Sequence, residues 1–130
     1  MSSTLVALRA AHHPETTPKY DRVVFEFNGT IPQLRIEYAN ELIGDGSGLP
    51  VPIGGRYILL VQFTPARAHS DTGQATAAAR MKPMLPIVKE LACAGDFEGV
   101  VTYGIGLGRK AYTRMLTMDN PRRLVIDFLA

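Results

Sequence analysis

The stretch TYGIGLGRK, residues 102–110, combines three glycines at alternate positions with two adjacent cations. Glycine-rich segments bind phosphate when they follow a strand and open a helix, because backbone N–H groups at a helix N-terminus attract anions. The Walker pattern needs a longer spacing that ends in Gly-Lys followed by Ser or Thr, whereas Arg-Lys-Ala stands here. The next residues, AYTRMLTM, are typical of a strand. The sequence therefore argues against a nucleotide ligand at this motif.

The same segment predicts a strand over residues 97–107 with an unusual face. Successive side chains of a strand point to opposite faces, so Gly104, Gly106 and Gly108 share one of them. A face without side chains lets a backbone, a bulky side chain or a ligand come close, and it permits a sharp bend. We interpret the three residues as structural glycines, with a ligand contact as the alternative.

The cysteine and the histidines show no arrangement for catalysis or metal binding. Cys93 lies in the apolar run VKELACAG with no histidine near it in the sequence, which favours a buried thiol over a nucleophile. His12, His13 and His69 lack the spacing of a zinc site, so we interpret them as surface residues and predict no metal.

Asp96 and Glu98 are the best local pair of carboxylates for hydrolysis, and they would face the same side of a strand. A structural role is favoured, in which Asp96 binds turn amides and Glu98 pairs with a cross-strand arginine. No Gly-x-Ser-x-Gly motif is present either. We therefore predict that the protein is not an enzyme and has no cofactor.

Basic residues near the end of the chain form the main candidate site. The net charge of +2 is too small to predict a nucleic-acid partner. The segment of residues 109–123, however, contains five cationic residues and only one carboxylate. The predicted binding residues are Arg109, Lys110, Tyr112, Arg114, Arg122 and Arg123.

The arrangement of these cations depends on how the last two strands pair. If residues 112–118 and 122–129 form a hairpin, the cations gather at its two ends with Arg114 between them. Such a surface would attract anionic polymers, and Tyr112 would stack on a sugar face. The alternative is a solvated edge that keeps the sheet from pairing with other chains.

Period-two alternation of apolar residues predicts about eight strands and a single domain of 130 residues. Short strands separated by turns predict an all-β fold, an antiparallel β-sandwich or small barrel. The expected strands cover residues 4–10, 20–29, 33–40, 56–64, 85–94, 97–107, 112–118 and 122–129. Residues 66–86 have no strong pattern and are predicted as a surface excursion with at most one short helix at 74–82.

Five segments stand in this order: YDRVVFEFNG, IEYANELIGDGSGLPVPIGG, LLVQFTPARAH, AGDFEGVVTYGIGLGRKAY and NPRRLVIDF. Together they resemble the AMIN-like domain family over residues 20–129. The most specific are GDFEGVVTYGIGLG and the closing PRRLVIDF, and the second also resembles the wider AMIN domain. The family consists of small envelope domains of Gram-positive bacteria, commonly on secreted proteins or lipoproteins. Its members have no assigned catalytic residues, so none are carried over.

The resemblance implies a non-catalytic, exported envelope module that contacts a cell-wall glycan, such as peptidoglycan, or an envelope protein. An export signal would then precede this sequence, and no segment is apolar enough to cross a membrane. Two other hypotheses for the function stay open. One is an interaction domain that uses an exposed sheet edge, with self-association included. The other is a small carrier of an apolar ligand between its sheets.

Overall fold

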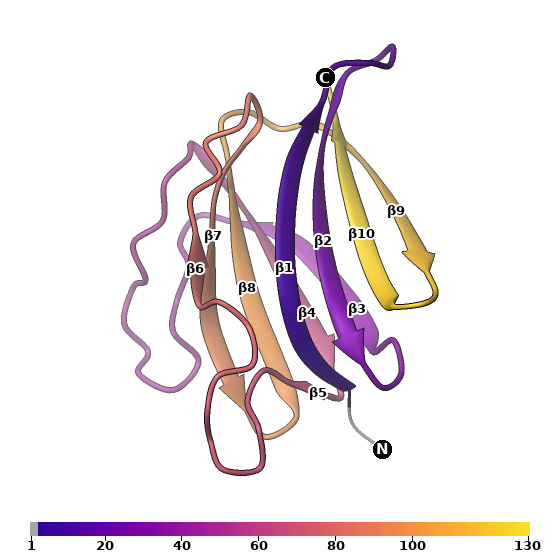
Figure 1. The fold of residues 1–130 in the computed structure, drawn as a ribbon. Helices are drawn as coiled ribbons and strands as arrows, with labels where there is room; N and C mark the ends of the chain where they lie inside the picture. Colours follow the sequence, from indigo (N-terminus) through magenta and orange to yellow (C-terminus); the bar gives the residue numbers. More distant parts are fainter. Residues whose placement is uncertain (1–2) are drawn as a thin grey trace.

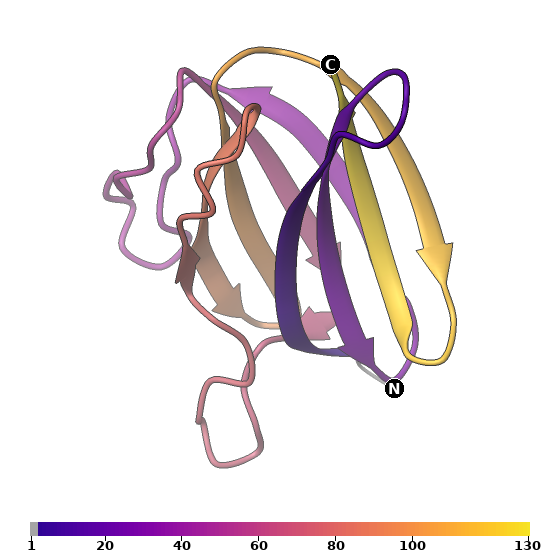
Figure 2. The ribbon, with the colours of Figure 1, turned by 45° about the horizontal axis from the view of Figure 1, so that its top comes forward.

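Ten strands form two sheets that pack face to face in the computed structural model, which describes residues 3–130 (Figures 1 and 2). The first sheet has the order β5 (Ala66–Arg67), β1 (Ser3–His13), β2 (Tyr20–Asn28), β10 (Arg122–Leu129), β9 (Tyr112–Met118). The second has the order β3 (Gln33–Ala39), β4 (Tyr57–Thr64), β8 (Val100–Leu107), β7 (Val88–Phe97), β6 (Arg80–Met81). All neighbouring strands are antiparallel except β1 and β5. The predicted all-β sandwich is confirmed.

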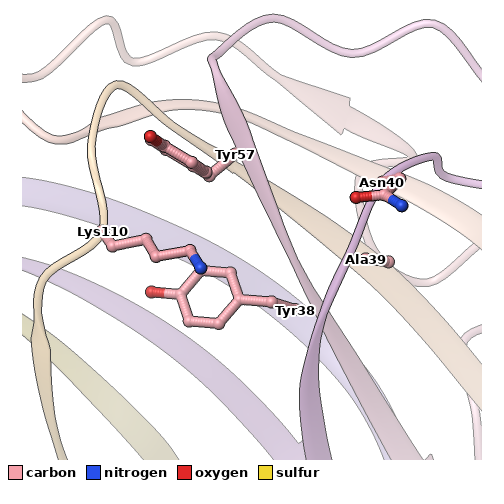
Figure 3. A pocket seen from close by; sticks show the side chains of 5 residues that line it. All are labelled: Tyr38, Ala39, Asn40, Tyr57 and Lys110. Atoms are coloured by element: carbon pink, nitrogen blue, oxygen red, sulfur yellow. The ribbon is translucent and has the colours of Figure 1, made fainter.

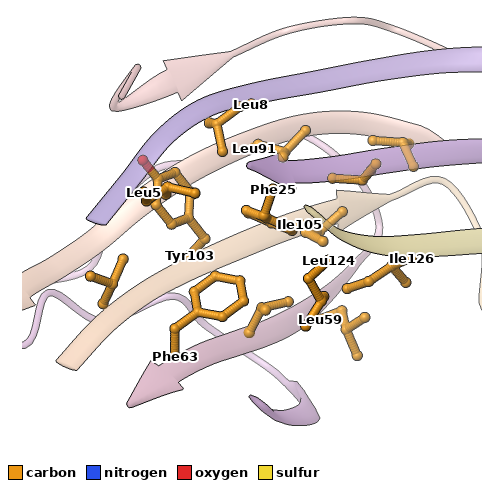
Figure 4. Close-up of a cluster of buried hydrophobic side chains, with 14 of the residues drawn as sticks. Leu5, Leu8, Phe25, Leu59, Phe63, Leu91, Tyr103, Ile105, Leu124 and Ile126 are labelled. Carbon is orange, nitrogen blue, oxygen red and sulfur yellow. The ribbon is translucent and has the colours of Figure 1, made fainter. Parts of the chain in front are cut away.

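The core lies between the sheets and consists of the side chains that alternation placed on one face of each strand (Figure 4). Phe25 of β2 packs against Phe63 of β4, with ring centroids 4.9 Å apart, and against Tyr103 of β8 at 5.9 Å. The Tyr103 hydroxyl donates to the carbonyl oxygen of Ala78 at 2.6 Å, which satisfies the polar end of a buried ring. Packed side chains therefore fill the space between the two sheets.

The predicted start of the strand over residues 97–107 is wrong, because β8 begins at Val100. β7 ends at Phe97, and Glu98 and Gly99 form a two-residue turn into β8, with φ values of 53° and 80°. Two-residue hairpin loops of this kind need positive φ at both positions, which favours Asn-Gly. Because Glu98 stands where asparagine is typical, the sequence did not indicate this turn. Asp96 and Glu98 consequently do not share a strand face.

The expected surface excursion at residues 66–86 is in part wrong. It holds the two short strands β5 and β6, and residues 3–130 contain no helix, so none forms at 74–82. Ala66 and Ala68 are buried, and Arg80 pairs with Glu90 of β7. Alanines carry no amphipathic signal, which is why the packed part of this segment was not visible in the sequence.

The loop between β3 and β4 folds over the outer face of the second sheet. An added Cβ at Gly106 would stand 1.7 Å from the carbonyl oxygen of Gly54, and one at Gly104 would stand 2.8 Å from a methyl carbon of Leu42. Leu42 forms a second, smaller apolar cluster with Ala92 and Ala94 of β7. The absence of side chains at Gly104 and Gly106 thus gives the loop a surface that it can approach closely.

Asp21 connects the two sheets through the core. Its side chain belongs to β2 and is fully buried. Its Oδ2 accepts hydrogen bonds from the backbone N–H groups of Ile87 at 2.7 Å and Val88 at 2.9 Å, where β7 begins. Its Oδ1 lies 2.7 Å from Nδ1 of His12. One carboxylate of the first sheet thus accepts hydrogen bonds from two backbone donors at the start of a strand in the second sheet.

Candidate functional site

An open hollow of about 310 Å³ lies beside the segment that crosses from β8 to β9. It is lined by Tyr38, Lys110, Ala111 and Tyr112. A second hollow of about 260 Å³ adjoins it and shares Tyr38 and Lys110, with Tyr57 added to the lining. We call the surface formed by Tyr38, Tyr57, Lys110 and Tyr112 the tyrosine hollow.

Strand order brings these four residues together. Tyr38 lies near the end of β3 and pairs with Leu59 of β4, so its ring lies on the core side but at a sheet edge, where it is 39% exposed. Tyr57 begins β4 and packs partly against the core. Tyr112 begins β9 and is 87% exposed. Three strand ends therefore present three aromatic rings around one loop.

Lys110 extends between two of the rings (Figure 3). Its ammonium nitrogen lies 4.9 Å from the ring centroid of Tyr38 and 5.5 Å from that of Tyr57, within the range of cation–π attraction. Among residues 3–130, no carboxylate lies within 4.0 Å of this nitrogen. The tyrosines orient the ammonium without neutralising it, so its charge is available to an anion.

The other predicted binding residues lie apart from the hollow lining. The predicted hairpin of the last two strands is confirmed, with Leu129 opposite Tyr112 at one end and Arg123 opposite Met118 at the other. At that second end, Arg122 donates to the carbonyl oxygen of Gly29 and Arg123 to that of Pro121, each at 3.0 Å. The structure thus brings Lys110 and Tyr112 together and places Arg122 and Arg123 at the far end of the hairpin.

Arg109 and Arg114 have partners within the chain. Arg109 donates to the carbonyl oxygen of Lys110 at 3.4 Å. Arg114 donates to Asp127 through two nitrogens, at 2.8 and 3.0 Å, and Arg22 donates to the same carboxylate. Both guanidinium groups also lie over the ring of Tyr20, at 5.2 and 5.4 Å. Sequence reasoning missed this cluster because its members lie on three strands.

The buried Asp127 carboxylate is held in its charged form. Burial alone would raise the pKa of Asp127, but the hydrogen bonds from Arg22 and Arg114 outweigh it and hold the pKa below its usual value. Because the pKa is lower in the folded state, the stabilisation is present above the unfolded pKa of about 3.9 and is lost as the pH falls through the lower, folded value.

Replacing Asp127 by asparagine should therefore lower the free energy of unfolding by about 2 kcal/mol at neutral pH, a value reduced because Arg114 is half exposed. Urea denaturation at a series of pH values would measure this difference. We expect it to shrink below about pH 4, where the parent protein also loses the charge. The surface variant Asp119→Asn is the control, and a difference for Asp127→Asn that stays constant down to pH 2 would contradict the electrostatic explanation.

The remaining chemical groups are dispersed. The three histidines contact Asp21, Glu15 and Asp96 at separate places, and no cluster of three metal-binding side chains occurs within residues 3–130. Burial raises the pKa of the Cys93 thiol, which disfavours the thiolate that a nucleophile needs.

Asp96 and Glu98, the pair of carboxylates considered as hydrolytic groups, differ in their surroundings. Asp96 accepts the backbone N–H of Ala68 at 3.1 Å, as expected of a structural carboxylate, and its other oxygen lies 2.7 Å from Nδ1 of His69. Glu98 lies in the turn and has no ion-pair partner in the described part of the chain, so the expected arginine partner is wrong.

Comparison with known proteins gives one match. A family model described as the AMIN-like domain matches residues 3–130, which covers both sheets and the tyrosine hollow. No curated protein and no solved structure matches the chain. The described residues include no helix with the length and apolarity of a membrane span.

Proposed function

The chain belongs to the AMIN-like domain family, and from this membership we propose that it is a binding module that holds an anionic envelope polymer, such as peptidoglycan, in the tyrosine hollow. Domains of this family are related to the cell envelope and are generally not enzymes. The proposed place of action is the cell envelope or the extracellular space. The observation that carries the ligand class is the Lys110 ammonium, which lies between tyrosine rings without a carboxylate partner.

The chemistry of the hollow suits a sugar that carries an acidic group. The exposed face of Tyr112 offers a flat apolar surface on which the C–H groups of a sugar ring can stack. The Lys110 ammonium would then bind a carboxylate or phosphate of the same polymer. A charge-assisted hydrogen bond of this kind contributes about 1.5–3 kcal/mol, which corresponds to about tenfold or more in affinity.

The carrier function is not proposed. Its ligand would lie between the sheets, where Phe25, Phe63 and Tyr103 are packed against one another. The hollow opens at the surface instead, beside Tyr112. A surface hollow suits a polymer that extends beyond the site better than a small molecule that must be enclosed.

Co-sedimentation with purified, insoluble cell wall tests the proposal. We expect the parent protein to bind at low salt and to bind less at high salt, because exposed charges are screened beyond about 10 Å at 0.1 M ionic strength. Lys110→Ala with Tyr112→Ala should reduce the affinity about tenfold or more. Arg122→Ala with Arg123→Ala is the matched control at the far end of the same hairpin, and it removes two charges without touching the hollow.

The outcomes separate the two ends of the hairpin. A loss of binding in the Arg122/Arg123 variant but not in the Lys110/Tyr112 variant would move the site to the turn between β9 and β10. If neither high salt nor either double variant lowers the affinity for cell wall, an electrostatic site on this hairpin is contradicted.

A further inference from the structure

The sandwich has four sheet edges, and the chain itself covers the edge beside β7. β6 pairs with part of that strand, and the N–H of Cys93 donates to the carbonyl oxygen of Ala79 at 2.8 Å. The N–H of Asp45 donates to the carbonyl oxygen of Ala94, also at 2.8 Å. Backbone groups along this edge are therefore already paired.

Two further edges carry features that oppose pairing with another chain. β1 has a bulge between Leu5 and Ala7, and β5 already pairs with its first residues, Ser3 and Thr4. β3 carries Arg35 and Glu37, whose side chains are 70% and 52% exposed and pair with each other at 3.1 Å. Bulges and charged side chains are the devices by which natural sheets keep their edges from pairing.

The fourth edge, β9, pairs with β10 without a bulge, and no described strand lies on its other side. Its sequence YTRMLTM lacks glycine, proline, lysine and acidic residues. Its single charge, Arg114, is directed back across the sheet toward Asp127 of β10 and Tyr20 of β2, away from the free edge. Met115 is 49% exposed although it pairs with the buried Ile126. Figures 1 and 2 show β9 at the outer edge of its sheet, with no strand beyond it.

We propose that β9 pairs in antiparallel fashion with the β9 of a second copy of this chain, so that the two first sheets form one continuous sheet in a homodimer. The strand sequence is complementary to itself when the two-fold axis passes Met115. In that register Thr113 lies opposite Thr117 of the other copy, and Tyr112 lies opposite Met118. Paired threonines and an aromatic ring beside a thioether are favourable cross-strand neighbours.

Charge also favours this register. Arg114 lies opposite Leu116 of the second copy rather than opposite another cation, so no like charges face each other directly. Met115 lies opposite its own symmetry copy, and each covers the half-exposed side chain of the other. A closed two-fold contact uses the same surface on both partners and leaves no further free edge of this kind. The dimer does not require a ligand in the tyrosine hollow, although Tyr112 belongs to both the hollow and β9.

Sedimentation equilibrium of the full chain over a range of concentrations tests the dimer. The parent protein should dimerise, and Met115→Lys should raise the dissociation constant about 100-fold, because two ammonium groups would then face each other across the axis. Gln33→Lys adds the same charge to another edge strand, β3 in the second sheet, and should leave the dimer unchanged. A monomeric parent, or a dimer that Met115→Lys leaves intact, would overturn the proposal.

Disulfide trapping tests the register and does not depend on the lysine variant folding. Opposite residues of antiparallel strands have Cα atoms about 4.5–5.5 Å apart, which is within disulfide range. Met115→Cys should therefore form an intermolecular disulfide under oxidation, whereas the parent, which has only the half-buried Cys93, should not. Tyr112→Cys and Met118→Cys should crosslink when mixed and not alone. Crosslinking of Met118→Cys with itself would contradict the register.

Discussion

Replacing Asp21 by alanine is expected to lower the free energy of unfolding by about 4 kcal/mol. The change removes the acceptor for the backbone N–H groups of Ile87 and Val88, and each buried donor left unpaired costs about 1–3 kcal/mol. The change also removes the contact with His12. Among the hydrogen bonds of residues 3–130, no other carboxylate connects the core face of β2 to the start of β7. A small domain is stabilised by about 5–15 kcal/mol in total, so the variant should lose a large share of its stability.

The asparagine variant makes this prediction specific. Both N–H groups donate to the same oxygen, Oδ2, so a carboxamide can place its one oxygen there and keep both hydrogen bonds. We expect Asp21→Asn to lose about 1–2 kcal/mol, since mainly the contact with His12 changes. Urea denaturation at neutral pH measures both values. The control Asp71→Ala, at a side chain that is 89% exposed, should change stability by less than about 1 kcal/mol. Equal losses for alanine and asparagine at position 21 would refute the acceptor role.

Replacing Gly106 by alanine is expected to destabilise the fold by about 3 kcal/mol. The new methyl group would overlap the carbonyl oxygen of Gly54, 1.7 Å away, and a backbone group of a packed loop cannot turn aside as a side chain can. Overpacking of this kind costs about 1–3 kcal/mol, and contact with backbone places the variant at the upper end. The loop between β3 and β4 would have to lift from the outer face of the second sheet.

Two other glycines provide a graded comparison by thermal or urea denaturation. At Gly104 the added Cβ meets the flexible end of Leu42 at 2.8 Å, so Gly104→Ala should cost about 1 kcal/mol. At Gly46 no atom lies within 4 Å, and Gly46→Ala should change stability by less than about 0.5 kcal/mol. If Gly106→Ala melts at the temperature of Gly46→Ala, the loop does not rest on this face.

The sequence predicted the elements better than the contacts between them. Alternation identified β2 and β4 because each carries a strict apolar face, and the turn before Arg122 identified the last hairpin. Asp21 and Val23 are two positions apart in β2 and therefore share a face, but this spacing gives no sign of which donors the carboxylate meets. Those donors lie more than sixty residues later, at the start of a strand in the other sheet.

The tyrosine hollow shows the same limit. The local charge pattern predicts Lys110 and Tyr112 as binding residues, whereas Tyr38 and Tyr57 stand in their strands with no charge pattern around them that indicates a site. The four residues meet because β4 pairs with both β3 and β8 and because the chain crosses to the other sheet at Lys110. Sheet order is set by packing over the whole chain, and no local pattern encodes it.

The placement of the aromatic residues gives the protein a built-in optical probe. The chain has no tryptophan and five tyrosines, so tyrosine dominates its intrinsic ultraviolet emission over the weakly fluorescent phenylalanines. Three of the five line the hollow, and the remaining two are Tyr20, under the guanidinium groups, and the buried Tyr103. Most of the fluorophores thus lie at the site where a polymer would bind. A titration can follow their intensity directly, without a label, and Tyr112→Phe would identify the share that comes from the most exposed ring.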